Sequence, residues 1–287
     1  MVIKSIESII RMILIKRRYN KSKLLLSNIL GNQQMASYPS FLIDGLDHII
    51  KLKQIDDFSL NLTNGEWICH IGGLEFAINS AEELLILREV FINGIYNIDS
   101  AQSFTFIDIG MNVGITSLFF AQKPECKKVI SFEPFKPTLS FARKNMEKNK
   151  VAQKIHINEV GLGYPSRTLT INYSEEHKGS VGINGVASYL GQKDLREEQL
   201  PILDVFEALN KIVDEKIILK IDCEGSEYEI LERLNETALL SRFNVIMIEW
   251  HFKGPCLLRK ILADNNFEIL SMGEHNLNIG MLYAFKK

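Results

Sequence analysis

The spacing of hydrophobic and polar positions changes along the chain. Up to about residue 52, apolar residues recur at helical spacing, which is typical of amphipathic helices. Between residues 58 and 78 they alternate with polar residues, and the pairs Asn64-Gly65 and Gly72-Gly73 interrupt the alternation. We therefore expect helices first and then a small β-ribbon or meander.

A capping-box pattern marks the beginning of the next helix. Ser80 is followed three places later by Glu83, and "SAEELLILREVFINGIY" continues with helical spacing. We place the domain boundary at this point. Residues 1–80 are expected to form an N-terminal helical and β-ribbon annex, and residues 81–287 to form the main domain.

Beyond about residue 101 the pattern of strand, turn and helix repeats. The expected strands are "SFTFIDIG", "KVISFEP", "KIHINEV", "KIILKID" and "FNVIMIEW", with helical spacing between most of them. Such alternation predicts an α/β fold with a doubly wound, mostly parallel sheet covered on both faces. No helix separates "NFEIL" from "IGMLYAFKK", so the sheet should end in an antiparallel C-terminal edge hairpin. "RTLTINY" is predicted as an extra strand.

Acidic residues follow the expected parallel strands. In a doubly wound sheet, ligands bind outside the carboxyl ends of the strands. The residues at those ends are Asp108, Glu133, Glu159, Asp222 and Glu249, and all of them are acidic. This edge of the sheet is therefore where we expect the functional site.

Two of these strand ends indicate an adenosine-containing cofactor. In "FIDIGMNVG", Gly110 and Gly114 let the backbone turn sharply after Asp108 and approach a ligand closely. Asn112 occupies the middle glycine position of a dinucleotide fingerprint. Glu133 in "VISFEP" is placed to accept hydrogen bonds from both hydroxyls of a ribose. The alternatives are a plain strand-to-helix turn and a solvated loop carboxylate.

The stretch "ILKIDCEGSEYEIL" places a lysine and several acids beside a buried strand. Lys220 and Asp222 share one face because strand side chains alternate, and a buried lysine needs a partner. We expect a structural ion pair with Asp222, or with Glu249 if its strand is adjacent. So many carboxylates in a cleft suit a cationic group such as the sulfonium of S-adenosylmethionine. Of Glu227 and Glu229 on the following helix, at least one is expected to be solvated.

The composition is that of an ordinary soluble globular protein. Among 287 residues, 46% are hydrophobic and 24% are charged, and a net charge of −2 gives no reason to expect a nucleic-acid partner. The four cysteines form no CxxC pair, which fits reduced thiols in a cytosolic protein better than a disulfide framework or a zinc site. We therefore expect a cytoplasmic protein.

Residues 1–23 depart from this average, since they contain seven Lys and Arg against one Glu, a local charge of +6. The longest uncharged run there is too short to span a bilayer, and no signal-peptide cleavage site follows. Two interpretations stay open. The segment is either a helix that packs on the protein body or on a second subunit, or a basic amphipathic helix in peripheral contact with an anionic membrane.

Several of these blocks, in this order, resemble the FkbM-type S-adenosylmethionine-dependent methyltransferases. The resemblance covers about residues 82–287 and rests on "FIDIGMNVG", "VISFEPFKPT", "LPILDVFEAL", "ILKIDCEGSEYEIL" and "VIMIEWH". It implies a Rossmann-like sheet of the class I methyltransferase type. It also implies cofactor-binding roles for Asp108, Gly110, Asn112, Gly114, Glu133, Glu159 and Asp222. Of these, Asp222 would lie at the methionine end of the cofactor, and Glu159 near the adenine.

Methyl transfer to a hydroxyl requires alignment of donor and acceptor and the removal of a proton. His251, after Glu249 and Trp250, is our first candidate for the general base, because histidine titrates near neutral pH; a surface histidine is the alternative. Asp222 and Glu224 are the other candidate catalytic residues. Together with Glu249 they also offer the oxygen ligands that Mg²⁺ prefers, so the resemblance permits Mg²⁺ as a second cofactor without requiring it.

The resemblance implies an S-adenosylmethionine-dependent O-methyltransferase that acts on a sugar hydroxyl of a glycan, glycolipid or glycosylated natural product. The alternative from another class is a catalytically silent binding scaffold of the same fold. The missing middle glycine and the many acids disfavour a nicotinamide-dependent oxidoreductase. The polar stretch 174–193 is either a lid over the acceptor or a loop without function. The oligomeric state stays open, a homo-oligomer included.

Overall fold

The computed structural model describes residues 19–30, 38–173, 181–182, 185–186, 196–272 and 278–287. The chain divides into two compact units, Met1–Ile95 and Tyr96–Lys287. The helix that follows Ser80 belongs to the first unit. This division by packing therefore falls later in the chain than the domain boundary after residue 80, which stays a prediction.

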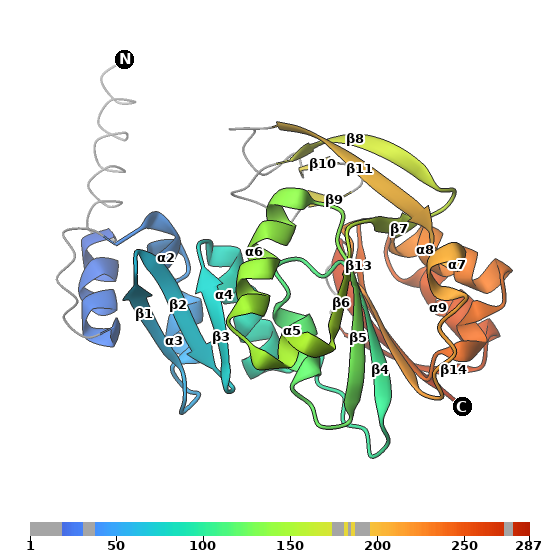
Figure 1. Ribbon diagram of the computed structural model, residues 1–287, viewed down its shortest axis with the longest axis horizontal. Coiled ribbons are helices and arrows are strands. Elements are labelled where there is room, and N and C mark those ends of the chain that lie inside the picture. The colour runs from blue at the N-terminus through green and yellow to red at the C-terminus, as the bar shows by residue number, and fades with distance from the viewer. Residues whose placement is uncertain (1–18, 31–37, 174–180, 183–184, 187–195, 273–277) are drawn as a thin grey trace, which may run out of the picture. The chain divides into compact units, whose positions relative to one another are not determined.

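The first unit combines helices with the predicted β-meander (Figure 1). Residues 19–30 are helical, and the further helical elements are α2 (Ser40–Asp44), α3 (Leu46–Leu52), α4 (Ala81–Arg88) and the π-helical turn η1 (Glu89–Asn93). The strands β1 (Ser59–Thr63), β2 (Glu66–Ile71) and β3 (Leu74–Ile78) pair antiparallel in that order. The capping box is confirmed, because the Ser80 hydroxyl accepts from the Glu83 N–H and the Glu83 carboxylate accepts from the Ser80 N–H.

The second unit is built around a large, mostly parallel sheet, as predicted. In the described part of the chain it has seven strands, in the order β14-β15-β13-β12-β4-β5-β6. They are β4 (Phe104–Ile109), β5 (Cys126–Phe132), β6 (Ile155–Asn158), β12 (Ile217–Ile221), β13 (Val245–His251), β14 (Phe267–Met272) and β15 (Ile279–Lys286). The five from β13 to β6 are parallel, whereas β15 and β14 pair antiparallel. The predicted C-terminal edge hairpin is confirmed.

Helices cover both faces of this sheet, which makes the fold doubly wound. Figure 1 shows α5 (Ile115–Ala121) and α6 (Lys136–Glu147) on one side. On the other side lie α7 (Val205–Leu209), α8 (Glu227–Glu236) and α9 (Cys256–Asp264). Apolar residues of α7, α8 and α9 form one buried cluster with alternate residues of the central strands, such as Leu219 and Ile246. The alternation of buried side chains thus leaves the other face of β4 and β12 to Asp108 and Lys220.

A second, smaller sheet was not predicted. Its described strands are β7 (Gly161–Gly163), β11 (Arg196–Asp204) and β8 (Arg167–Tyr173), in the order β7-β11-β8. The extra strand expected at "RTLTINY" is confirmed as β8, but its partner β11 was missed. The segment "REEQLPI" begins with charged residues and contains Pro201, so its sequence does not resemble a strand. Pairing with β8 and burial of Leu200 and Ile202 against Phe135 stabilise it there.

Two predictions fall on residues that the structure describes only in part. Of the stretch 174–193, the described residues form the short antiparallel pair β9 (Val181–Gly182) and β10 (Gly185–Val186), and the rest lies outside the described residues. Residues 1–18 of the basic N-terminal segment also lie outside them. Among the residues that are described, no helix has both the length and the apolar character needed to cross a membrane.

Candidate active site

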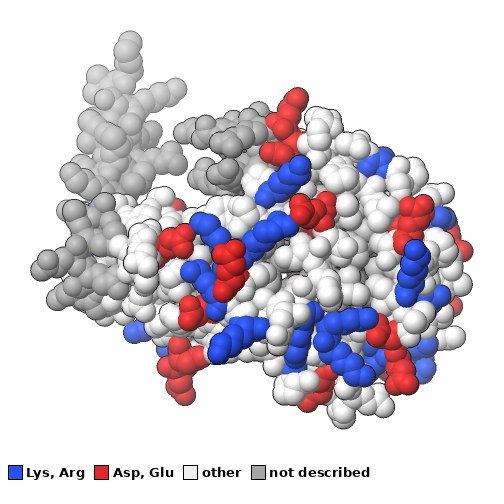
Figure 2. Space-filling model, in the orientation of Figure 1, with Lys and Arg blue, Asp and Glu red and all other residues white. Residues whose placement is uncertain are grey.

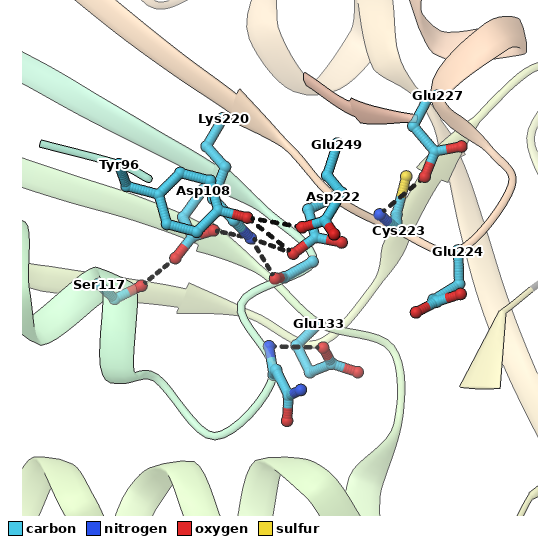
Figure 3. Close-up of polar contacts among 12 residues, drawn as sticks. Tyr96, Asp108, Ser117, Glu133, Lys220, Asp222, Cys223, Glu224, Glu227 and Glu249 are labelled. Carbon is cyan, nitrogen blue, oxygen red and sulfur yellow. Dashed lines mark hydrogen bonds and ion pairs between the residues drawn. The ribbon is translucent and has the colours of Figure 1, made fainter. Parts of the chain in front are cut away.

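The carboxyl ends of the parallel strands meet at one edge of the sheet, as expected. Register places Asp108 of β4 beside Lys220 of β12, and Lys220 beside Met247 of β13. Figure 3 shows Asp108, Glu133, Asp222 and Glu249 gathered at this edge. The sequence-based location of the site is therefore supported by the topology, while the partner of each side chain required the structure.

Lys220 lies at the centre of a buried ion-pair cluster. Its Nζ lies 3.0 Å from Asp108 Oδ1 and 3.3 Å from Asp222 Oδ2, and it donates to the Gly110 carbonyl at 2.8 Å. Burial alone would lower the pKa of this lysine, but the charges of Asp108 and Asp222 raise it further than burial lowers it. Lys220 therefore stays charged. The predicted pairing with Asp222 is confirmed, and Asp108 is a closer partner that the sequence did not suggest.

Asp108 points into the protein rather than into a cleft. Its side chain is fully buried, and Oδ2 accepts a 2.6 Å hydrogen bond from the Ser117 hydroxyl while Oδ1 faces Lys220. The family resemblance places Asp108 among the cofactor-binding residues. Since both of its oxygens have partners inside the protein, a direct contact is not what the geometry favours. Its influence on a ligand would pass through Lys220 to the Gly110 carbonyl.

The loop after β4 approaches the neighbouring strand end closely. Gly110 and Gly114 have φ values of +83° and +84°, a conformation that favours glycine. A Cβ atom on Gly110 would lie 1.7 Å from the Asp222 carbonyl oxygen. Next in the loop, the Asn112 N–H donates to Glu133 Oε2 at 2.9 Å. The sharp turn predicted at both glycines is thus confirmed, whereas their close approach to a ligand stays a prediction.

Glu133 joins this loop to the end of β5. Its Oε1 accepts from the Phe135 N–H at 3.0 Å, its Oε2 accepts from Asn112, and the residue is only 5% exposed. Burial raises the pKa of Glu133 to about 7, although both backbone hydrogen bonds lower it. The carboxyl group therefore changes its charge near neutral pH, and each oxygen keeps a lone pair for another donor.

Tyr96 joins the two acids on the other side of Lys220. Its hydroxyl lies 3.2 Å from Asp222 Oδ2 and 3.1 Å from Glu249 Oε2, and Lys220 Nζ lies 5.4 Å from the centre of its ring (Figure 3). Sequence analysis missed Tyr96. It follows Gly94 at the end of a helical pattern, and nothing local distinguishes it from an ordinary apolar residue.

The described residues do not support the magnesium site expected from the acids at this edge. Within the described residues, no group of three or more His, Cys, Asp or Glu side chains gathers to hold a metal ion. Asp222 and Glu249 share the Tyr96 hydroxyl, whereas Glu224 lies near His251. The three carboxylates therefore belong to two separate groups.

Glu227 organises the loop between β12 and α8. Its carboxylate is fully buried and accepts from the backbone N–H groups of Cys223 and Gly225. It also lies 2.9 Å from His251 Nδ1, and the other ring nitrogen of this histidine lies 3.6 Å from Glu224 Oε1. Glu224 itself has a φ of 53°, so this short loop is held in a conformation unusual for a non-glycine residue.

Neither of the first two acids of α8 is simply solvated, so that prediction was wrong. Glu227 pairs with His251 inside the protein. Glu229 accepts two hydrogen bonds from the Arg167 guanidinium, at 2.8 and 3.0 Å. Both carboxylates lie in the first turn, where they also favour the helix dipole, but their positions are determined by distant partners.

His251 is held as an imidazolium, which corrects our assignment of it as general base. It is 4% exposed, so it is not a surface histidine either. Burial would lower the pKa of its ring, but the hydrogen bond with Glu227 and the charge of Glu224 raise the pKa to about 10. A ring that is already protonated at neutral pH cannot accept another proton.

We expect the His251 ring to titrate in the folded protein with a midpoint of about 10, which NMR of the ring nitrogens would measure. Because the unfolded chain releases this proton near 6.5, the free energy of unfolding should fall as pH rises from 6.5 to about 10. Glu227→Gln should lower the midpoint. A midpoint near 6.5 in the unaltered protein would contradict this and make His251 a candidate base again.

Glu159, the expected adenine contact, lies at the end of β6. It is exposed and forms an ion pair with Arg143, whose side chain is also about half exposed. The contacts of Glu159 do not connect it to the other site residues described above, and its role at adenine stays a prediction.

Comparison with known proteins identifies the family. The family model described as "Methyltransferase FkbM domain" matches residues 108–269, more than half of the 287-residue chain. The chain belongs to the FkbM methyltransferase family. The matched range begins at Asp108 and includes the loop between β12 and α8 as well as His251, whereas Tyr96 lies before it. Membership in a family of methyltransferases removes the oxidoreductase interpretation.

Two relatives of this FkbM methyltransferase are themselves named as methyltransferases. Methyltransferase sdnD of Sordaria araneosa is 25% identical over 221 residues, which span 68% of this chain and 85% of that protein. The 31-O-demethyl-FK506 methyltransferase FkbM of Streptomyces tacrolimicus is 26% identical over 221 residues, 67% of this chain and 81% of its own.

A crystal structure of methyltransferase FkbM from Methylobacillus flagellatus is 16% identical to this chain. It covers 66% of this chain and 45% of its own length, with a TM-score of 0.45. The family assignment does not rest on that similarity.

Proposed function

We propose that this FkbM methyltransferase uses S-adenosylmethionine and methylates a hydroxyl group, with a sugar hydroxyl of a glycan, glycolipid or glycosylated natural product as acceptor. The observation that carries the proposal is the contact between the Gly110–Gly114 loop and Glu133 at the carboxyl ends of β4 and β5. The sugar acceptor is supported by the family resemblance alone.

The residues at this edge suit such a cofactor. Gly110 lets the loop after β4 pass close to the Asp222 carbonyl, so the strand ends that would hold the cofactor come together. Glu133 is able to accept from the two ribose hydroxyls with the lone pairs that its backbone partners leave open. Asp222, with a side chain 27% exposed, would lie at the methionine end. When bound, S-adenosylmethionine supplies a methyl carbon that is already activated for displacement.

The protein must then align the acceptor and remove its proton. The acceptor oxygen would bond to the methyl carbon as the bond from that carbon to sulfur breaks and S-adenosylhomocysteine leaves, and the acceptor proton would pass to a carboxylate. Glu224, 3.6 Å from the His251 ring, is one candidate for this carboxylate. Figure 3 shows Glu224 apart from the Lys220 cluster, and its side chain is 21% exposed. Asp222 is the other candidate base.

The basic N-terminal segment is the basis of a second proposal, namely peripheral contact of a cytoplasmic enzyme with an anionic membrane. The charge of +6 in residues 1–23, seven Lys and Arg less one Glu, supports it. Flotation with vesicles of phosphatidylglycerol would test it. Deletion of residues 1–23 should abolish flotation at low salt, and unchanged flotation would overturn the proposal.

Calorimetric titration with S-adenosylhomocysteine tests the cofactor proposal. The intact chain should bind, and Glu133→Ala should bind at least about tenfold more weakly, since two charge-assisted hydrogen bonds are lost. Glu229→Ala is the matched control, because it removes a glutamate whose partner, Arg167, lies outside the proposed site. No binding by the folded intact chain would overturn the proposal and favour a binding scaffold.

Binding of S-adenosylhomocysteine should also depend on pH through Glu133. The ribose hydroxyls donate to the carboxylate, so binding favours the ionised form of a group whose pKa is about 7. The association constant should therefore rise about tenfold between pH 6 and pH 8 and then level off. Glu133→Gln, which cannot titrate, should remove this rise. A flat profile in the intact chain would contradict a role for Glu133 at the ribose.

A further inference from the structure

Phe252 combines a bulky side chain with a backbone conformation that side chains disfavour. It follows directly after β13 and has a φ of 68°. Among the described non-glycine residues with positive φ, it alone carries an aromatic ring, whereas three of the others are asparagines, which adopt this region more readily. Local backbone preference therefore does not explain why a phenylalanine occupies this position.

Hydrogen bonds fix the turn that carries Phe252. Its N–H donates to the Asn278 carbonyl at 2.7 Å, which joins the turn to the residue before β15. The Tyr228 hydroxyl lies 3.0 Å from the carbonyl oxygens of both His251 and Gly254, which flank the turn. The surroundings thus hold the strained backbone in place, and such strain is concentrated at functional sites.

The ring of Phe252 lies beside the proposed site and is exposed. The residue is 47% exposed, and the centre of its ring lies 5.9 Å from that of the His251 imidazolium. The Nε2 atom of the same imidazolium lies 3.6 Å from Glu224 Oε1. The exposed ring and a candidate base therefore adjoin one buried residue. Because burial of the ring is only partial, packing alone gives little reason for the strain, and the strain indicates a role at the surface.

We infer that Phe252 is an acceptor-binding residue, whose exposed ring stacks on the apolar face of a pyranose and holds its reactive hydroxyl group beside Glu224. The inference rests on the proposed function and deepens it, because it names a residue that recognises the sugar. It adds no chemical step to methyl transfer. Phe252 contributes by orienting the acceptor, which a displacement at carbon requires.

The chemistry of a pyranose suits such a ring. Its hydroxyl groups lie around the edge, while C–H groups on one face form a flat apolar surface. An aromatic ring is flat and apolar too, and its face carries partial negative charge that attracts C–H groups. Stacking therefore covers the apolar face of the sugar and leaves its hydroxyl groups free to reach polar side chains.

The experiment measures binding of pyranosides to the full chain loaded with S-adenosylhomocysteine. The probes are the methyl pyranosides of glucose, galactose, mannose and rhamnose, titrated by saturation-transfer difference NMR. At least one should bind, with the strongest saturation on the C–H protons of one face. Phe252→Ala should weaken its binding about threefold to tenfold, and Phe252→Tyr should retain it within about twofold. All variants should bind S-adenosylhomocysteine as the intact chain does.

Phe252→Gly separates the ring from the backbone. Glycine adopts a positive φ without strain, so this variant should unfold at a higher urea concentration than Phe252→Ala. Both variants lack the ring and should bind the pyranoside equally weakly. Affinity should thus follow the ring while stability follows the backbone. If affinity instead rises with stability from the alanine to the glycine variant, Phe252 acts only through the fold, which overturns the inference.

Phe285→Ala is the matched control for loss of an exposed ring. Phe285 is 37% exposed on β15 and pairs with Val245, at the end of β13 opposite to Phe252. This substitution should leave the affinity for the pyranoside unchanged. An equal loss in Phe285→Ala and Phe252→Ala would overturn the inference, since the effect would not depend on position.

Failure of the proposed function gives a different result. If the folded intact chain does not bind S-adenosylhomocysteine, the cofactor proposal falls and the inference falls with it. If the loaded chain binds none of the four pyranosides, the sugar acceptor and the inference fall, while the cofactor proposal stands. If a pyranoside binds equally well to Phe252→Ala, only the inference falls.

Discussion

Lys220→Met is expected to lower the free energy of unfolding of the second unit by about 3–5 kcal/mol. The substitution leaves Asp108 fully buried without its cation and removes the donor to the Gly110 carbonyl. Asp222 loses its counter-charge as well. Breaking a buried pair from one side costs far more than the pair itself contributes, because the remaining charge stays out of water.

Urea denaturation measures this loss. The chain has two tryptophans, so a Trp67→Phe background leaves Trp250 of β13 as a reporter of the second unit. Lys260→Met is the control, since Lys260 and Asp264 form a helix-surface pair with side chains 72% and 61% exposed. It should cost about 0.5 kcal/mol or less. If Lys220→Met and Lys260→Met lower the free energy of unfolding equally, the Lys220 cluster is not both buried and charged.

Gly110→Ala is expected to destabilise the second unit by about 4 kcal/mol or more and to abolish binding of S-adenosylhomocysteine. The added Cβ would lie 1.7 Å from the backbone oxygen of Asp222. Neither chain segment moves easily, because Gly110 accepts from Lys220 and the Asp222 N–H donates to Ile109. The left-handed backbone at Gly110 adds about 1 kcal/mol of strain.

Gly254→Ala separates the strain from the clash. Gly254 lies in the same unit with a φ of +73°, and among the described atoms nothing lies within 4 Å of its added Cβ. Gly254→Ala should lower the free energy of unfolding by about 1 kcal/mol, which is the cost of the backbone strain alone. The two variants are compared in unfolding free energy by denaturation and in affinity for S-adenosylhomocysteine by calorimetry. If both quantities fall by similar amounts in the two variants, the close approach at Gly110 does not hold in solution.

Much of the fold follows from patterns that neighbouring residues determine. Alternation predicted the β-meander, the repeated strand and helix predicted the parallel sheet, and the spacing of Ser80 and Glu83 predicted a capping box. Each of these depends on residues a few places apart. The strand β11 has no such pattern, because it exists through pairing with β8 and packing against Phe135.

The chemistry of the site depended more on distant partners. The sequence located the acids at one edge and suggested a partner for Lys220. It placed His251 as a base because histidine usually titrates near neutral pH. Glu227, which lies 24 residues away along the chain, raises the pKa of the His251 ring, since its carboxylate holds the proton on the ring. A pKa follows from what surrounds a group, and the sequence does not state the surroundings.

By itself, therefore, the sequence determined the order of most strands and helices, the edge at which the acids lie, and the glycine turns of the loop after β4. Only the tertiary structure decided which groups touch. Lys220 meets Asp108 across 112 positions, and Tyr96 meets Asp222 and Glu249 across 126 and 153. Local patterns arise from short-range hydrogen bonding and burial, whereas such contacts arise when the packed sheet brings distant strand ends together.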